Sequence, residues 1–269
     1  ELGFKDNETI PNFILYGEKY IRNLWKIPDT KFEIIEQKLM VSIKGINNLT
    51  TTTEELYILS EIFFEGIYNF ESNYPVIVID VGMNVGFSCL FFASKNCVQK
   101  VIGYEPLKPT YERALENFKL NKELSLKIIT HNIGLGEFSE QKNITYCENR
   151  KGTVGITDDK HFLPPKGSKI SQEKVSIVPA KDIIEELLTQ NYQNKIICKI
   201  DCEGSEYAIL RSLSSINEEN LPVIFIIEWH YKGYQNILDF FNSRGFSTLL
   251  FSPFSNDIGM LYAFKTNKI

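Results

Sequence analysis

Several features that would direct a protein to a membrane or to an oxidising compartment are missing from this chain of 269 residues. No apolar run approaches the roughly 18 residues of a membrane-spanning helix, and no signal peptide is visible. The five cysteines are odd in number and form no C-x-x-C pair, so we expect reduced thiols in a cytoplasmic protein without a membrane span. The chain begins with Glu1 rather than Met, which is consistent with a segment of a longer polypeptide.

An excess of positive charge is also missing. The formal net charge is -5 and the isoelectric point is about 5.4, so no overall basic field would attract nucleic acid. The chain also lacks an N-P-P-Y-type motif for methylating amide or base nitrogens, because the corresponding strand ends in I-D-C-E-G. We therefore expect no nucleic-acid partner.

The third missing feature is the dinucleotide fingerprint G-x-G-x-x-G. In its place, an apolar run over residues 76–81 leads into D-x-G-x-N-x-G, with Asp80 on the strand and Gly82, Asn84 and Gly86 in the turn. A strand, a glycine turn and a helix over residues 87–95 are how an α/β sheet builds a nucleotide site. Asp80 would repel a pyrophosphate but suits a cationic ligand such as S-adenosylmethionine. A nicotinamide-dependent oxidoreductase is therefore the weaker alternative.

The fold class follows from alternating apolar runs and helical segments, which indicate a doubly wound α/β fold with a mostly parallel sheet. The runs expected to be parallel strands are 76–81, 100–104, 126–131, 195–200 and 223–228. The last two runs, 247–251 and 260–264, are too close for a crossover helix, so they should form an antiparallel hairpin that completes a seven-stranded sheet. This is the class I methyltransferase variant of the Rossmann-like fold.

Two regions fall outside this alternation. Residues 1–74 are expected to form an N-terminal helical and extended preface, followed by a methyltransferase domain over 75–269. Within the preface, helical spacing marks residues 10–25, and a capping-box pattern of Thr52 and Glu55 opens a helix over 54–70. Residues 137–181 are polar and rich in glycine and proline, and we interpret them as an irregular excursion over the active-site face.

Ligands bind at the carboxyl ends of the strands in such sheets, so each strand end should supply a cofactor contact. Asp80 and the turn follow the first strand, and Glu105 follows the second, where a carboxylate can accept hydrogen bonds from both ribose hydroxyls. Asn132 and Ile133 follow the third strand, near an adenine. Asp201 follows the fourth.

The same rim should carry the chemistry of methyl transfer. Asp201 and Glu203 follow the fourth strand, while Glu228 and His230 follow the fifth. In one hypothesis His230 or Asp201 is the general base, with Glu203 as a further catalytic candidate. In the other, Asp201, Glu228 and His230 hold a divalent cation such as Mg²⁺ that binds two vicinal hydroxyls. The competing interpretation is a carboxylate cluster neutralised by Lys199 and the amino group of the cofactor.

Several segments resemble the FkbM family of S-adenosylmethionine-dependent methyltransferases over about residues 75–265. The matching segments are I-D-V-G-M-N-V-G-F-S at 79–88, G-Y-E-P at 103–106, L-E-N-F-K-L-N at 115–121, N-I-G-L-G at 132–136, K-I-D-C-E-G-S-E at 199–206 and I-I-E-W-H at 226–230. The resemblance implies O-methylation, often of a sugar or a sugar-derived product. Residues 179–182, P-A-K-D, depart from the family pattern, which commonly has a β-branched residue and leucine before the aspartate.

We therefore expect an O-methyltransferase for a hydroxyl of a sugar, nucleotide-sugar or surface-polysaccharide intermediate. A non-catalytic binding module of the same fold and a methyltransferase for a non-sugar small molecule remain alternatives. A composition rich in Asn, Lys, Ile and Phe is typical of AT-rich bacterial genomes, where a capsular polysaccharide pathway is plausible. The acceptor, the oligomeric state and the role of residues 1–74 are left open. Among the other candidates, His131 and His161 are expected to be structural or solvent-exposed, and Arg150, Lys151 and Lys160 solvated.

Overall fold

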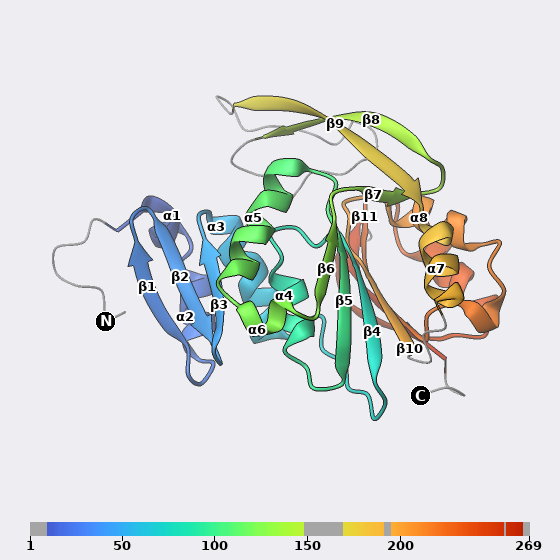
Figure 1. The fold of residues 1–269 in the computed structure, drawn as a ribbon, viewed down its shortest axis with the longest axis horizontal. Coiled ribbons are helices and arrows are strands. Elements are labelled where there is room, and N and C mark those ends of the chain that lie inside the picture. The colour runs from blue at the N-terminus through green and yellow to red at the C-terminus, as the bar shows by residue number, and fades with distance from the viewer. Residues whose placement is uncertain (1–9, 148–168, 191–194, 256, 266–269) are drawn as a thin grey trace.

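The computed structural model describes residues 10–147, 169–190, 195–255 and 257–265, and its centre is a seven-stranded sheet (Figure 1). The strands are β4 (Val76–Val81), β5 (Val98–Tyr104), β6 (Ile128–His131), β10 (Lys195–Ile200), β11 (Ile224–His230), β12 (Ser247–Ser255) and β13 (Ile258–Phe264). Their order across the sheet is β12-β13-β11-β10-β4-β5-β6. Neighbouring strands among β11, β10, β4, β5 and β6 pair in parallel, whereas β13 is antiparallel to both of its neighbours, β11 and β12. This confirms the predicted class I methyltransferase sheet with its terminal hairpin.

Helices cover both faces of the sheet. They are α4 (Phe87–Ala93), α5 (Lys108–Lys119), α6 (Lys122–Ser125), α7 (Ala180–Thr189), α8 (Glu206–Leu213) and α9 (Gln235–Asn242), with the short η4 (Glu218–Asn220). Side chains of β4 alternate between two cores, since Val76 and Val78 pack in the cluster with α4 and α5, and Ile77 and Ile79 pack in the cluster with α7, α8 and α9. Burial of both faces explains why this strand is apolar without interruption.

The chain reverses its direction across the sheet between β4 and β10. It runs outward from β4 to β6 and then returns to β10 on the other side of β4. A crevice forms at the carboxyl ends of strands where such a reversal occurs. The site is therefore expected between the residues that follow β4 and those that follow β10.

The N-terminal preface contains helices and a small antiparallel sheet. Its elements from residue 10 onward are α1 (Asn12–Tyr16), α2 (Glu18–Trp25), β1 (Lys31–Ile35), β2 (Lys38–Ile43), β3 (Ile46–Thr50), α3 (Thr53–Leu59) and a π-helical stretch, η1 (Ser60–Glu65). The Thr52 side chain accepts a hydrogen bond from the Glu55 N–H at 3.1 Å, which confirms the predicted helix start. Buried residues of α2 and α3 belong to the same core cluster as α4, so no break in packing marks residue 75, and the domain division stays a prediction.

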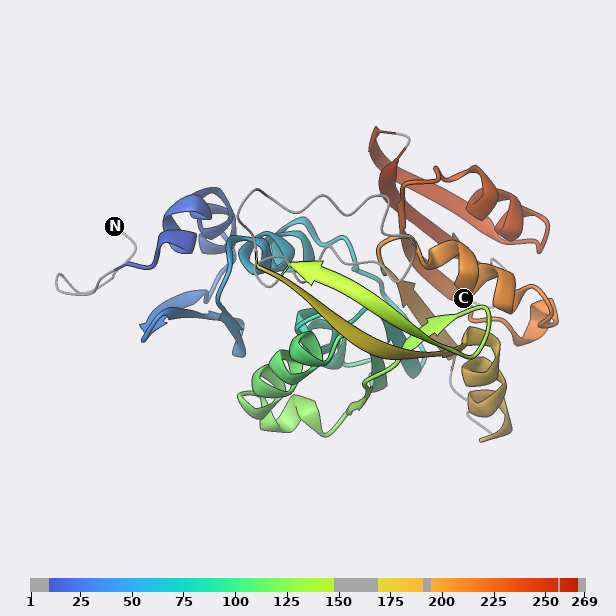
Figure 2. The same cartoon turned by 90° about the horizontal axis from the view of Figure 1, so that it is seen from above.

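The prediction that residues 137–181 are irregular is partly wrong. A three-stranded sheet lies across the carboxyl end of the main sheet (Figures 1 and 2). Its strands are β7 (Gly134–Gly136), β8 (Glu140–Cys147) and β9 (Ile170–Pro179). Ile144, Val175 and Ile177 make a small buried cluster, and the alternate side chains are polar and more exposed. That alternation is a strand signal, which the overall polarity of the segment hid. Residues 148–168, including His161, Arg150, Lys151 and Lys160, lie outside the described part.

No helix among the described residues combines the length and apolar character needed to cross a bilayer.

Candidate active site

Two adjoining cavities lie at the carboxyl ends of β4, β10 and their neighbours. The larger has a volume of about 420 Å³ and the smaller of about 60 Å³. Both are lined by Gly82, Asn84, Asp201 and Glu203, so they meet at the switch point of the sheet. A volume of this order suits a small ligand.

The glycine turn between β4 and α4 forms the floor where the cavities meet. Gly82, Asn84 and Gly86 all have left-handed φ angles, of 77°, 51° and 85°. A Cβ on Gly82 would lie 1.8 Å from the backbone oxygen of Asp201, so only glycine permits this approach of the two strand ends. Gly86 instead packs against α5, where a Cβ would lie 2.6 Å from Phe118, and it lines neither cavity.

Asp80 lies behind this turn rather than in a cavity. It is 0% exposed. Its carboxylate accepts a hydrogen bond from the Ser88 hydroxyl at 2.6 Å and forms an ion pair with Lys199 at 3.1 Å. The structure thus places the predicted cofactor-binding acid where Lys199, and not a ligand, neutralises it.

Glu105 lines the smaller cavity, as a ribose-binding residue would. Its carboxylate accepts hydrogen bonds from the backbone N–H of Asn84 at 3.2 Å and of Leu107 at 2.9 Å. Burial raises the pKa of Glu105 to about 7, although these two bonds act in the opposite direction. The carboxylate therefore has fixed geometry and retains lone pairs for further donors.

The residues predicted for adenine contact do not line the cavity. The amide of Asn132 donates to the backbone oxygens of Glu105 and Pro106, at 2.9 and 3.0 Å, and Ile133 packs on the core. Gly134 and Leu135 line the smaller cavity in their place. The segment after β6 thus reaches the smaller cavity, but through residues two positions beyond those predicted.

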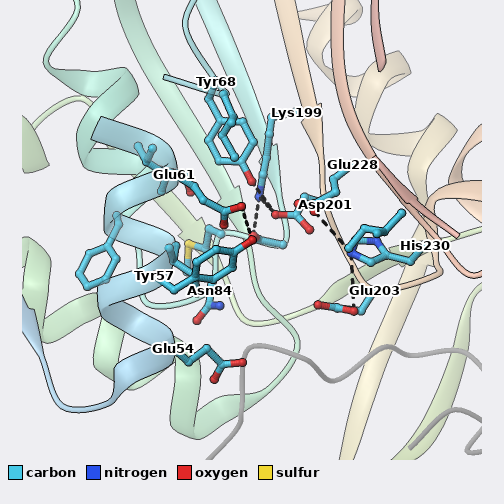
Figure 3. Close-up of a pocket in the computed structure, with 18 of the residues that line it drawn as sticks. Glu54, Tyr57, Glu61, Tyr68, Asn84, Lys199, Asp201, Glu203, Glu228 and His230 are labelled. Carbon is cyan, nitrogen blue, oxygen red and sulfur yellow. Dashed lines mark hydrogen bonds and ion pairs between the residues drawn. The ribbon is translucent and has the colours of Figure 1, made fainter. Parts of the chain in front are cut away.

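Asp201, Glu203, Glu228 and His230 all line the larger cavity, as predicted (Figure 3). One ligand atom from each of Asp201, Glu228 and His230 lies within 4.8 Å of the others, a separation that a metal ion could bridge. Glu203 adopts a left-handed φ of 53° just before Gly204, so the turn projects its carboxylate beside the ring of His230, at 3.7 Å from Nε2.

Burial and neighbouring charges shift the pKa values of these groups. Burial raises the pKa of Glu203 to about 7, against the effect of His230, and burial together with Asp201 raises the pKa of Glu228. Burial lowers the pKa of His230, but its hydrogen bond to Glu206 and the nearby carboxylates outweigh this and raise it to about 10. His230 is therefore a cation at neutral pH in this arrangement.

Glu206 was missed by the sequence reasoning. It is 0% exposed, and its Oε1 accepts hydrogen bonds from His230 Nδ1 at 3.0 Å and from the N–H groups of Cys202 and Gly204, both at 3.1 Å. One carboxylate thus ties the loop after β10 to the end of β11. The available signal was the position of Glu206 in the family-like segment E-G-S-E, but no local pattern showed that it would bind His230.

The N-terminal preface supplies the opposite wall of the larger cavity. The residues it contributes, from α3, η1 and the segment after them, are Glu54, Tyr57, Ile58, Glu61, Ile62, Ile67 and Tyr68. The Tyr68 hydroxyl donates to Asp201 Oδ2 at 2.6 Å, and burial raises the pKa of Glu61 to about 7. Tyr57, Glu61 and Tyr68 lie on the side of the cavity opposite His230 (Figure 3). π-helical turns are frequent at functional sites, but the sequence pattern did not reveal this one.

The other side chains to place are the aromatic residues around the end of β11, His131 and the cysteines. Trp229 is 0% exposed and packs against Tyr234, whereas Tyr231 lines the larger cavity. His131 stacks on Tyr104 with ring centroids 5.1 Å apart. All five cysteines are free.

Comparison with known proteins finds a matching family and related proteins. The family model described as the methyltransferase FkbM domain matches residues 80–248. The methyltransferase sdnD of Sordaria araneosa is 23% identical over 201 residues, which cover 67% of this chain and 77% of that protein. The AMB antimetabolite synthetase AmbE of Pseudomonas aeruginosa is 27% identical over 119 residues, which cover 43% of this chain and 5% of that protein.

Among solved structures, a methyltransferase FkbM from Methylobacillus flagellatus is similar, with 16% sequence identity and a TM-score of 0.46. The match covers 93% of this chain and 60% of that one, so the present chain spans less than two thirds of its length.

Proposed function

The chain belongs to the FkbM family of S-adenosylmethionine-dependent methyltransferases, and we propose that its methyl acceptor is a hydroxyl group of a sugar, nucleotide-sugar or surface-polysaccharide intermediate. The free cysteines support our proposal of a cytoplasmic enzyme that acts on an intermediate before export.

The residues present fit the cofactor. Because Gly82 has no Cβ, the turn and the end of β10 can meet, and both Gly82 and Asp201 line the two cavities where the cofactor would lie. We assign Glu105 to the ribose hydroxyls, Gly134 and Leu135 to the adenine side of the smaller cavity, and Asn84 and Asp201 to the amino-acid end. When bound, S-adenosylmethionine supplies a methyl group on a positively charged sulfur.

The observation that carries the acceptor assignment is the lining of the larger cavity. Its described carboxylates include Glu61, Asp201, Glu203 and Glu228, which accept hydrogen bonds from hydroxyl groups, and Tyr57 offers an aromatic surface for a sugar ring. The two cations among the described lining residues, Lys199 and His230, are already close to carboxylates. Among the acceptors proposed above, this balance favours an uncharged sugar over a nucleotide-sugar, which carries a pyrophosphate.

Within this site Asp201 is the better candidate for the general base. Removal of the hydroxyl proton needs an acceptor, and a positioned base contributes about 10²- to 10⁴-fold. His230 is protonated at neutral pH and so cannot accept it in this charge state. A cationic His230 would instead stabilise the negative charge that develops on the acceptor oxygen, and its neighbour Glu203 would orient the hydroxyl.

A second version adds a divalent cation held by Asp201, Glu228 and His230. Their ligand atoms are close enough, and hard oxygen donors favour Mg²⁺ or a similar ion. The cation would require His230 to lose its proton and would then acidify a bound hydroxyl.

Calorimetric titration of S-adenosylhomocysteine tests the first part of the proposal. We expect micromolar binding by the wild type, and no binding would bring the non-catalytic module forward. The acceptor is then tested with methyl-labelled cofactor and matched pairs of a neutral monosaccharide and its nucleotide-sugar. Label on a sugar oxygen supports the proposal, whereas label only on a nitrogen or on a non-sugar compound contradicts it.

A further inference from the structure

Lys199 is an unusual residue for its position, because lysine is seldom fully buried. It is 1% exposed, is the next-to-last residue of β10 and lies directly opposite Asp80 in the parallel pair with β4. Its ammonium nitrogen lies 3.1 Å from Asp80 Oδ1 and 3.6 Å from Asp201 Oδ2. Burial lowers the pKa of Lys199, but these two carboxylates outweigh it and raise the pKa, so the group is charged.

The same nitrogen also binds the backbone of the glycine turn. It donates to the carbonyl oxygen of Gly82 at 2.6 Å and to that of Val81 at 3.3 Å. On the far side of the turn, Glu105 accepts the N–H of Asn84 at 3.2 Å. The turn is thus fixed from two sides, by a buried cation on its carbonyls and by a buried carboxylate on its N–H.

We infer that Lys199 is a positioning residue for the cofactor site: its ammonium holds the carbonyls of Val81 and Gly82 and the carboxylate of Asp201 in place, and Asp80 acts through Lys199 rather than by touching the cofactor. The inference rests on the proposed function, since it takes the turn to be the cofactor floor. The geometry supports it because Asp80 has no exposed surface, whereas Lys199 lines the larger cavity.

A purely structural role is the competing explanation, in which Lys199 only neutralises Asp80. Removing one partner of a buried ion pair leaves the other charge unpaired and destabilises the fold, so a single substitution cannot separate the two roles. The comparison that separates them is D80N against K199M/D80N, because the buried negative charge is absent from both.

The matched control is Lys265, a second buried lysine that donates to two backbone carbonyls, of Glu218 and Leu221. It follows the last strand at the opposite end of the sheet, beside the start of β11, where its own N–H donates to Val223. K265M should therefore lower the thermal midpoint without changing cofactor affinity.

The experiment measures thermal unfolding and the calorimetric Kd for S-adenosylhomocysteine in the wild type, D80N, K199M/D80N and K265M, well below each midpoint. We expect K199M/D80N to bind at least about tenfold more weakly than D80N, which is what one lost charge-assisted hydrogen bond costs, and K265M to bind within about twofold of the wild type. Equal affinity of D80N and K199M/D80N would overturn the positioning role while leaving the proposed function intact. Absence of binding by the wild type would overturn both.

Discussion

The close approach of Gly82 to β10 can be tested against another glycine of this chain. Gly45 has a similar left-handed φ, 85° against 77°, but a Cβ there meets nothing within 4 Å. At Gly82 the same Cβ would lie 1.8 Å from the Asp201 oxygen and 2.9 Å from its carbonyl carbon, which are backbone atoms. The pair G82A and G45A therefore differs in steric contact and hardly at all in backbone conformation.

The magnitudes follow from these contacts. An alanine in the left-handed region costs about 1–2 kcal/mol, which is the whole effect expected for G45A. G82A adds a forced displacement of the strand end, and overpacking of that kind costs a further ~1–3 kcal/mol. Because Asp201 must move away from the turn, S-adenosylhomocysteine should bind G82A at least about tenfold more weakly, and G45A as tightly as the wild type.

Urea unfolding gives the two free energies of unfolding, and calorimetry at low temperature gives the affinities. The reasoning fails if G82A is no less stable than G45A, or if its affinity is unchanged. Either result would mean that the strand ends do not meet as the structure shows.

Three further predictions concern single groups. Because the pKa of Glu105 in the folded state is raised from 4.5 to about 7, the folded state binds this proton more tightly than the unfolded state, and the free energy of unfolding should fall as the pH rises from 4.5 through 7. The fall due to this group is up to about 3 kcal/mol. E105Q should remove it, and identical pH profiles for E105Q and the wild type would contradict the raised pKa. Y68F removes the 2.6 Å hydrogen bond to Asp201, which as a bond to a charged group is worth ~1.5–3 kcal/mol, so it should weaken binding of S-adenosylhomocysteine. Y262F, which removes a hydrogen bond to the Ile67 carbonyl, should lower stability alone. Equal affinities of Y68F and Y262F for S-adenosylhomocysteine would refute this role of Tyr68. If the cation proposal is right, EDTA should abolish methyl transfer and added Mg²⁺ should restore it, while activity that survives chelation would exclude the metal and leave Asp201 as the base.

The sequence predicted the main sheet well because its signals are local. An uninterrupted apolar run of strand length needs burial on both faces, and a short connection between the last two runs permits only an antiparallel hairpin. The turn after Asp80 was likewise predictable, since small residues at alternate positions between a strand and a helix have few other conformations. Polarity misled the prediction for β8 and β9, where buried residues such as Ile144, Val175 and Ile177 alternate with polar, more exposed ones.

The candidate site was predicted as a set of strand ends but not as a set of contacts. Asp201, Glu203, Glu228 and His230 do line one cavity, because the carboxyl ends of parallel strands meet at one edge. The prediction could not show that Glu206 binds His230, since the two residues are 24 positions apart.

By itself, the sequence determined the fold class, the position of the turn and the carboxylates available at the rim, because strand runs, turn residues and strand ends are properties of neighbouring residues. The tertiary structure alone decided that Asp80 is sealed behind Lys199, and that Tyr57, Glu61 and Tyr68 of the preface form the wall opposite Asp201. Tyr68 and Asp201, which share a hydrogen bond, lie 133 residues apart in the chain. Only the packing of the preface against the main sheet brings them together, and no local pattern encodes the distance between two side chains that meet across a core.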